Sequence, residues 1–324
     1  DLWSNSAHAK ADAPAFTHWN EADPAEIPTS CAKCHSDAGF QDYVGADGSA
    51  VFTVDKAAPI GSVITCKTCH NDGTAKLTTV KFPSGAEITG LGREAVCMTC
   101  HQGSASMVQV DAAIEKAGVT DEDTVSADLG FTNIHYYAAA VSRYGTEVKG
   151  GYQYEGKSYD ALFDHASGMQ TCTDCHNSHS LELEVDKCSA CHTGVKTVED
   201  LHNIRMESST RDYNGNGNVT EGIYYEVDGL RTMLYQAIQE YAKEVSQTPI
   251  VYSADAYPYF FVDTNADGKA DPDELTAQNG FKSWTARLAK AAFNYQISIK
   301  DTGGYTHGGK YIIELLYDLI DNLN

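Results

Sequence analysis

Apolar residues recur at helical spacing in the last third of the 324-residue chain. One apolar stripe runs through residues 229–245, a second runs through residues 284–299, and residues 310–323 form a third, strongly apolar segment. A repeat at positions i, i+3, i+4 and i+7 is typical of amphipathic helices that bury one face. The pattern therefore predicts a helical C-terminal region over residues 206–324.

Residues 1–205 lack such long periodic segments, which predicts short helices and irregular structure with few strands. Two segments stand out from this background. A helix is expected around His135, where residues 131–140 combine aromatic and small side chains. A hairpin is expected over residues 150–159, where tyrosines alternate with polar residues between glycines.

All ten cysteines belong to five C-x-x-C-H motifs, so none remains for a disulfide framework or a free thiol. The motif residues are Cys31, Cys34 and His35; Cys66, Cys69 and His70; Cys97, Cys100 and His101; Cys172, Cys175 and His176; and Cys188, Cys191 and His192.

This spacing suits covalent haem attachment. Two thiols three residues apart reach the two vinyl groups of one haem, and the adjacent histidine binds the iron. A C-x-x-C pair alone also occurs in zinc sites and redox dithiols, but five pairs each followed by histidine favour haem. The motifs predict five haems c. They also predict the fold class, a mostly α and irregular multihaem cytochrome c whose haems form much of the core of residues 1–205.

Each iron needs a second axial ligand, and seven of the twelve histidines lie outside the motifs. The five preferred candidates are His8, His18, His135, His165 and His179. His202 and His307 are the remaining two. Since the supply exceeds the demand, the count requires no open catalytic iron. Methionine is the alternative second ligand, and it raises the reduction potential of the haem.

Charge and chain ends restrict the partners and the location. The formal charge of −22 argues against nucleic acid or an anionic membrane surface, and favours either a solvated acidic surface or an acidic docking face. No run approaches the roughly 18 apolar residues of a membrane span. The start at Asp1, without a signal pattern, is interpreted as that of a mature exported chain. Covalent haem attachment outside the cytoplasm predicts an extracellular or cell-surface location, with the periplasm as the alternative.

Two acidic loops in the C-terminal region match the calcium-loop template, which has oxygen ligands at alternate positions and a glutamate at position 12. The first loop supplies Asp263, Asn265, Asp267, Lys269, Asp271 and Glu274. The second supplies Asp212, Asn214, Asn216, Asn218 and Glu221 from a shortened loop. We expect one or two calcium ions that staple the structure, with a solvated acidic turn as the alternative.

The five motifs, the arm that carries His8 and His18, and the Asn133-x-His135-Tyr136 segment resemble the secreted multihaem cytochromes of metal-respiring and related anaerobic microbes. Some members of that family polymerise into extracellular filaments, or nanowires, with one continuous haem stack. The resemblance implies bis-histidine haems that pass electrons to redox proteins or extracellular acceptors. It also implies a homopolymer by haem-to-haem contact, in which His8 or His18 ligates a haem of the neighbouring subunit.

Two other functions stay open. One is a monomeric periplasmic or cell-surface shuttle, and the other is a multihaem reductase with one open haem. Pentahaem nitrite reductase is the natural comparison for the second, but its catalytic haem has lysine in place of the motif histidine. All five motifs here end in histidine, so we expect an electron carrier rather than an enzyme.

Overall fold

The computed structural model describes residues 2–324, so Asp1, the first residue of the predicted haem region, lies outside the described residues. The chain divides into two compact units. Unit 1 contains the chain up to Lys81, then Glu87–Cys100 and Asp164–Val198; unit 2 contains Phe82–Ala86, His101–Phe163 and Glu199–Asn324. Each unit therefore combines segments that are far apart in the sequence. The predicted division into domains 1–205 and 206–324 stays a prediction.

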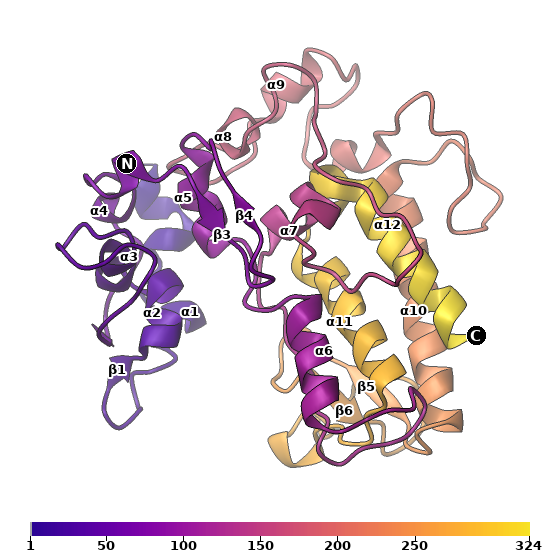
Figure 1. The fold of residues 1–324 in the computed structure, drawn as a ribbon. Helices are drawn as coiled ribbons and strands as arrows, with labels where there is room; N and C mark the ends of the chain where they lie inside the picture. The colour runs from indigo at the N-terminus through magenta and orange to yellow at the C-terminus, as the bar shows by residue number, and fades with distance from the viewer. Residues whose placement is uncertain (1) are drawn as a thin grey trace. The chain divides into compact units, whose positions relative to one another are not determined.

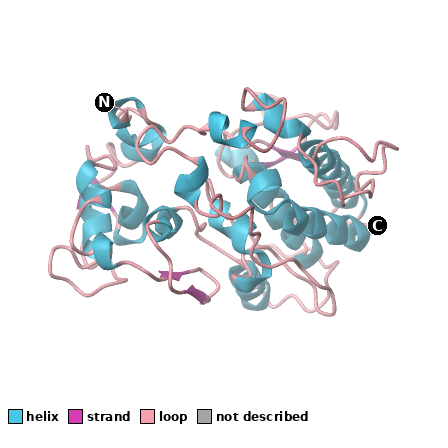
Figure 2. Ribbon diagram, turned by 90° about the horizontal axis from the view of Figure 1, so that it is seen from above, coloured by secondary structure: helices cyan, strands magenta, loops and turns pink. Residues whose placement is uncertain are grey.

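The predicted fold class is confirmed. Helices and irregular segments dominate, and the strands of the described residues form three two-stranded antiparallel pairs (Figure 2). The pairs join β1 to β2, β3 to β4 and β5 to β6. Their registers place Glu26 opposite Pro59, Val80 opposite Ile88, and Val251 opposite Phe261.

Unit 1 consists of short elements joined by turns. Its helices are α1 (Pro14–Thr17), α2 (Thr29–His35), α3 (Asp37–Tyr43), α4 (Cys66–Cys69), α5 (Glu94–Cys100), α8 (Cys172–Cys175) and α9 (Val185–Ser189). Its 3-10 turns are η1 (Trp3–Asn5), η2 (Ala7–Ala9) and η3 (Thr74–Lys76), and its strands are β1 (Glu26–Ile27), β2 (Ala58–Pro59), β3 (Val80–Lys81) and β4 (Glu87–Ile88).

Unit 2 contains the long helices. They are α6 (Met107–Lys116), α7 (Ala139–Tyr144), α10 (Ile223–Glu244), α11 (Ala286–Lys300) and α12 (Gly304–Leu323). Its 3-10 turns are η4 (Gly145–Glu147), η5 (Glu199–Asn203) and η6 (Ala277–Asn279), and its strands are β5 (Ile250–Tyr252) and β6 (Phe260–Val262). The three predicted C-terminal helices are confirmed as α10, α11 and α12, which pack on one another (Figure 1).

The two units differ in how they are filled. A large apolar core in unit 2 joins α10, α11 and α12, with Leu234, Phe293 and Leu316 fully buried. In unit 1, by contrast, one core cluster contains only Ile27, Ala32 and Ala58 as buried members. Other apolar side chains of unit 1, such as Phe40 and Met98, are buried outside that cluster, and a core filled by haems stays a prediction.

Two expectations about local structure are wrong. Residues around His135 form an irregular segment, and the helix begins only at Ala139; His135 and Tyr137 both have positive φ, a conformation that no α-helix accepts. The hairpin over residues 150–159 is also missing, because side chains bind its backbone. Asn294 bonds both the N–H and the carbonyl of Tyr152, and the Tyr159 hydroxyl accepts from Tyr154 N–H.

Within the part of the chain that the structure describes, no helix combines the length and the apolar character needed to cross a membrane.

Candidate haem sites

Each C-x-x-C-H motif lies on or at the end of one helical turn. Such a turn points both thiols of a motif to the same side, and the motif histidine ends it. The backbone N–H of His70 bonds the carbonyl of Cys66 at 2.9 Å, and the same bond joins His176 to Cys172 and His192 to Cys188. The spacing of the motif is therefore the spacing of one closed turn.

Local capping explains why two of these short turns form. The Thr65 hydroxyl accepts a hydrogen bond from Lys67 N–H, and the Thr68 hydroxyl accepts one from Thr65 N–H, a capping box at the start of α4. In α8 the Asp174 carboxylate accepts from the N–H and the hydroxyl of Thr171 at 2.7 and 2.8 Å. These bonds from Thr171 lower the pKa of Asp174. These capping residues, which lie next to or inside the motifs, thus stabilise the two cysteine turns locally.

Three motif histidines are oriented through Nδ1. His35 Nδ1 donates to the carbonyl of Ala15 at 2.8 Å, and His101 Nδ1 to that of Tyr137 at 3.0 Å. His176 Nδ1 donates to Leu181 at 3.2 Å. Because a carbonyl only accepts, the proton lies on Nδ1 and the lone pair on Nε2, as a metal-binding imidazole requires. Burial lowers the pKa of His35, which also favours the neutral, ligating form.

The attachment turns of unit 1 lie in an unbroken succession. Helix α2 contacts α5, α5 contacts α8, and α8 contacts α9. At the first junction the Cys100 thiol lies 3.8 Å from the carbonyl of Lys33, and at the second the Cys172 thiol lies 4.0 Å from the Glu94 carboxylate. The turn of the second motif is tied to α3 by a 2.6 Å bond from Thr68 to Asp37. Groups attached at these turns are neighbours along the whole series.

Two pairs of histidine rings are spaced as the two ligands of one iron. The rings of His70 and His179 have centroids 6.2 Å apart and planes 15° from parallel. The rings of His165 and His192 are 6.0 Å apart with planes at 44°. Imidazole nitrogen binds a metal at about 2.0 Å, so two rings on opposite sides of one ion have centroids roughly 6 Å apart. Each pair joins a motif histidine to a histidine predicted as a second ligand.

The residues present fit haem c. Paired thiols lie on single turns beside histidines whose Nδ1 is occupied, and two of the motif histidines face a second imidazole across a gap of the right width. Thioether attachment and axial ligation by these side chains agree with that arrangement.

The other three preferred histidines, His8, His18 and His135, lie in short turns and irregular segments. His8 is in η2, where its carbonyl accepts from Ile64 N–H at 3.2 Å. His18 follows α1, and its ring contacts Trp19, which in turn contacts His35. His135 has its N–H bonded to the side chain of Asn133, two residues from the carbonyl that orients His101. Their ligand roles stay predictions.

The two remaining histidines differ from each other. The His202 ring stacks face to face on Tyr224 with centroids 3.7 Å apart and planes 7° from parallel, and its edge meets Tyr305. His307, near the start of α12, bonds the carboxylate of buried Asp301 through Nδ1. Burial alone would raise the pKa of Asp301, but His307 and the surrounding hydrogen bonds hold it below its ordinary value.

The first acidic loop folds around its own carboxylates. Asp263 accepts from Gly268 N–H at 2.8 Å, and Glu274 accepts from the N–H and the hydroxyl of Thr264 at 2.6 and 2.8 Å. Asn265 and Asp267 each accept from the residue two positions later. Gly268 has φ of 79°, a left-handed conformation that suits glycine at position 6 of the template.

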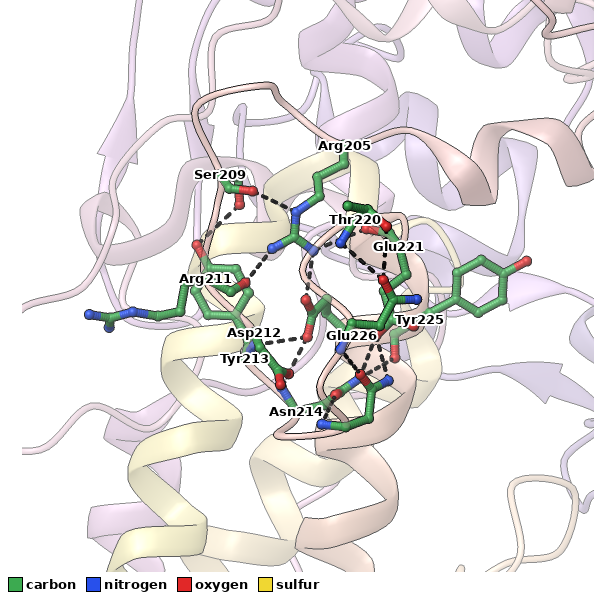
Figure 3. Close-up of polar contacts among 12 residues, drawn as sticks. Arg205, Ser209, Arg211, Asp212, Tyr213, Asn214, Thr220, Glu221, Tyr225 and Glu226 are labelled. Carbon is green, nitrogen blue, oxygen red and sulfur yellow. Dashed lines mark hydrogen bonds and ion pairs between the residues drawn. The ribbon is translucent and has the colours of Figure 1, made fainter.

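The second acidic loop is closed by residues outside its predicted ligand set. Asp212 accepts from Gly215 and Gly217 N–H, and Asn214 and Asn216 both donate to Glu221. The carboxylate of Glu226, on α10, accepts from the N–H groups of Tyr213 and Asn214 at 2.9 Å (Figure 3).

Arg205 faces this carboxylate. Its Nη1 lies 2.6 Å from Glu226, and both side chains are buried, with exposed fractions of 7% and 0%. The guanidinium also donates to the carbonyls of Ser209, Arg211 and Glu221 (Figure 3). The second loop is therefore held by a protein cation, which its loop motif alone did not indicate. The sequence signal for Glu226 is a carboxylate in the first turn of α10, four positions before Leu230 and therefore on the same face as the apolar stripe.

Among residues 2–324, no group of three or more His, Cys, Asp or Glu side chains is arranged to hold a metal ion. The calcium-loop residues above are brought together within each loop, while their predicted calcium stays a prediction.

Comparison with known proteins agrees with the haem chemistry. Residues 14–102 match the family of cytochrome c7 and related cytochrome c. The chain is 29% identical over 376 aligned residues to the C-type polyheme cytochrome OmcB of Geobacter sulfurreducens, covering 95% of this chain and 45% of that protein. It is 30% identical to the C-type polyheme cytochrome OmcC of the same species, covering 96% of this chain and 44% of that protein. The chain thus spans less than half the length of these relatives. No solved structure matches it. Together with its motifs and its mostly helical, irregular fold, these similarities show that the chain is a multihaem c-type cytochrome.

Proposed function

We propose that this protein carries electrons through five haems c, each closed by two histidines, and does not act as an enzyme. The observation that supports this most directly is the pairing of His70 with His179 and of His165 with His192. An iron bound by two imidazoles has no position left for a substrate. A haem held in this way supplies reversible one-electron chemistry.

Hydrogen bonds within the protein orient the motif histidines for iron binding. Carbonyl oxygens hold the Nδ1 protons of His35, His101 and His176, so the Nε2 lone pairs are directed for binding. The succession of α2, α5, α8 and α9 brings the attachment turns close together. Neighbouring haems pass electrons without diffusion of the protein, so this succession supports conduction along unit 1.

Exposure of the thiols suggests where electrons enter and leave. Cys66 and Cys69 of the second motif and Cys191 of the fifth are exposed, while the other seven cysteines are partly buried. Haems attached at the second and fifth motifs would therefore have edges near the surface. With a charge of −22, we expect cationic or metal-bearing redox partners at these points.

We propose an extracellular or cell-surface location, with the periplasm as the alternative, because haem is attached covalently outside the cytoplasm. Polymerisation by haem-to-haem contact is the second proposal, and exposed attachment points at two motifs support it. The N-terminal arm gives no added support to ligation of a haem in the neighbouring subunit by His8 or His18. Its residue Ala15 contacts the motif histidine His35 of the same chain. Electron microscopy of the haem-loaded protein separates filaments from discrete particles, and discrete particles alone would leave the monomeric shuttle.

Calcium is proposed for the loop at residues 263–274. Asp263 and Glu274 are 5% and 2% exposed, and burying two carboxylates in one loop is costly unless a cation joins them. The second loop has the Arg205 guanidinium beside its buried carboxylate, so a calcium ion there stays a weaker proposal.

The test of electron carriage is spectroscopic. Haem is quantified as the pyridine haemochrome against protein mass, and spin state is measured by electron paramagnetic resonance of the oxidised protein. Five haems, all low-spin, are expected. A high-spin ferric fraction that binds added ligands such as nitrite would favour the multihaem reductase instead.

A further inference from the structure

One segment, residues 133–140, binds both the ring and the backbone of the third motif histidine. The Nδ1 of His101 donates to the carbonyl of Tyr137 at 3.0 Å. The carbonyl of His101 accepts from the N–H of Ala140, also at 3.0 Å. The rings of His101 and Tyr137 meet edge to face with centroids 6.4 Å apart. The position of this motif histidine therefore depends on the position of the segment.

The residues that follow the motif contact the same segment. The N–H of Ser104 donates to the carbonyl of Ile134 at 2.9 Å. A side chain at Gly103 would meet Ile134 Cδ1 at 2.8 Å, so the backbone at this glycine lies directly against the isoleucine. A shift of Ile134 would therefore move the chain next to His101 as well.

The segment has a backbone shape that needs support from outside. His135 and Tyr137 have φ values of 76° and 53°, in the left-handed region. This conformation costs free energy at residues other than glycine, and it persists where surrounding contacts fix it.

Helix α11 supplies such contacts. Gln296 Oε1 accepts from the N–H of Ile134 at 3.0 Å, and both residues are fully buried. One turn later, the carbonyl of Lys300 accepts from the N–H of Tyr137 at 3.0 Å, and its ammonium lies 3.7 Å from the centre of the Tyr136 ring. Gln296 and Lys300 are four positions apart, so they lie on one face of the helix. The helix itself belongs to the apolar core of unit 2, which makes it a rigid support.

We infer that Gln296 is a positioning residue for the haem of the third motif. It holds Ile134, and through residues 133–140 it sets the hydrogen bond from His101 Nδ1 to Tyr137. A neutral amide oxygen suits this place, because it accepts a buried N–H without bringing a charge into the core. The inference rests on the proposed ligation of haem iron by His101. It gives the C-terminal region, which contains no C-x-x-C-H motif, a part in tuning one haem.

The Nδ1 hydrogen bond affects the electronic character of the ligand. An imidazole that donates a well-aligned hydrogen bond is more basic, which stabilises the oxidised metal and lowers its potential. A looser segment would weaken the bond from His101 to Tyr137 and let the ring turn. Loss of the Gln296 acceptor should therefore raise the potential of one haem and change the orientation of one axial imidazole.

The test uses the haem-loaded full chain and the variant Gln296→Met, which keeps the side-chain length and removes the acceptor. One of the five potentials should rise in a spectroelectrochemical titration while all haems stay low-spin. In the proton magnetic resonance spectrum of the oxidised protein, the methyl shifts of that haem should change, because they depend on the orientation of the axial imidazoles. Contacts of its thioether groups with Cys97 and Cys100 assign the haem to the third motif.

Asn294→Leu is the matched control. Asn294 is also buried on α11, and its side chain bonds the N–H and the carbonyl of Tyr152, outside residues 133–140. This variant should destabilise unit 2 without shifting any haem potential. An equal shift in Asn294→Leu would indicate general loosening of α11 and would overturn the inference.

Hydrogen exchange in the wild type tests the same arrangement if Gln296→Met folds poorly. The N–H groups of Ile134 and Tyr137 should exchange as slowly as the core amides of α11, because release of the segment requires both bonds to the helix to open. Fast exchange at both positions would mean that α11 does not hold the segment.

Unshifted potentials and methyl resonances in Gln296→Met, or a shift confined to a haem of another motif, would also overturn the inference. A wild type with fewer than five haems, or with high-spin haem, would instead contradict the proposed function, so the two failures are distinguishable.

Discussion

The imidazole rings of His70 and His179 lie 6.2 Å apart at their centroids, with planes only 15° from parallel. His202 and Tyr224 form a stack at 3.7 Å, so the larger separation is not that of a direct stack. His70 ends the second attachment turn, and His179 follows the fourth by three residues. In the proposed ligand set, the second ligand of one haem lies beside the motif of another haem, which would couple the two sites mechanically.

Replacing His179 by methionine should change one haem only. Methionine ligation raises haem potential, so one of the five potentials should shift upward while every haem stays low-spin. A spectroelectrochemical titration measures this. Ser178→Ala is the control, because its hydroxyl lies 3.4 Å from His179 Nδ1 but is not a ligand. If none of the five haem potentials shifts in His179→Met, then His179 is not a haem ligand.

Arg205→Ala should destabilise unit 2 strongly. The change leaves the Glu226 carboxylate buried without its cation, and breaking a buried ion pair on one side costs about 3–5 kcal/mol. Chemical denaturation followed by far-ultraviolet circular dichroism measures the loss.

Arg205→Lys is the matched variant. Lysine keeps the charge but cannot replace the guanidinium bonds to Ser209, Arg211 and Glu221, so it should recover only part of the loss. A free energy of unfolding equal to that of the wild type in Arg205→Ala would show that the pair contributes nothing.

Calcium should bind with a stoichiometry of one. Asp263→Asn should abolish binding measured by titration calorimetry, because it removes a buried carboxylate from position 1 of the first loop. Asp212→Asn, the same change at position 1 of the second loop, should leave binding intact. Two ions per chain, one lost in each variant, would instead establish calcium at both loops.

The pH dependence of stability should contain a contribution from Lys300. Burial lowers its pKa from 10.5 to about 8, against the weaker opposing effect of Asp255. Its ammonium lies 3.7 Å from the centre of the Tyr136 ring and 4.6 Å from that of Tyr259, and it donates to the carbonyl of Ala254.

Between these two pKa values the unfolded chain holds the Lys300 proton and the folded chain releases it. Stability should therefore rise with pH from about 8 to 10.5. Lys300→Met should flatten this rise in denaturation curves taken across that window, whereas Lys282→Met, at an exposed position, should retain it. An equal slope in Lys300→Met and the wild type would contradict the assignment.

Local rules predicted the parts of the fold that are local. The motif turns and the amphipathic helices α10, α11 and α12 need only spacing and periodicity. The segment around His135 failed because its N–H groups bond distant partners: Ile134 donates to Gln296 and Tyr137 to the carbonyl of Lys300. The 150–159 segment failed similarly, since Asn294 lies 142 positions away from Tyr152. Contacts at such separation leave no trace in a short window.

The candidate sites show the same limit. Cysteine spacing predicted the attachment turns, and ligand counting predicted His165 and His179, whose rings lie near motif histidines. Counting could not show which acceptor holds each Nδ1, for example the Asp301 carboxylate beside His307. The loop motif likewise could not show that Glu226, beyond its end, meets Arg205.

The carbonyl oxygens of Ala15, Tyr137 and Leu181 have a consequence for energy coupling. A carbonyl does not take up the Nδ1 proton, so in haems bound as proposed each of these imidazoles would stay neutral. Electron arrival at those haems would then move no proton at the ligand, and we expect their potentials to gain no pH dependence from these three histidines.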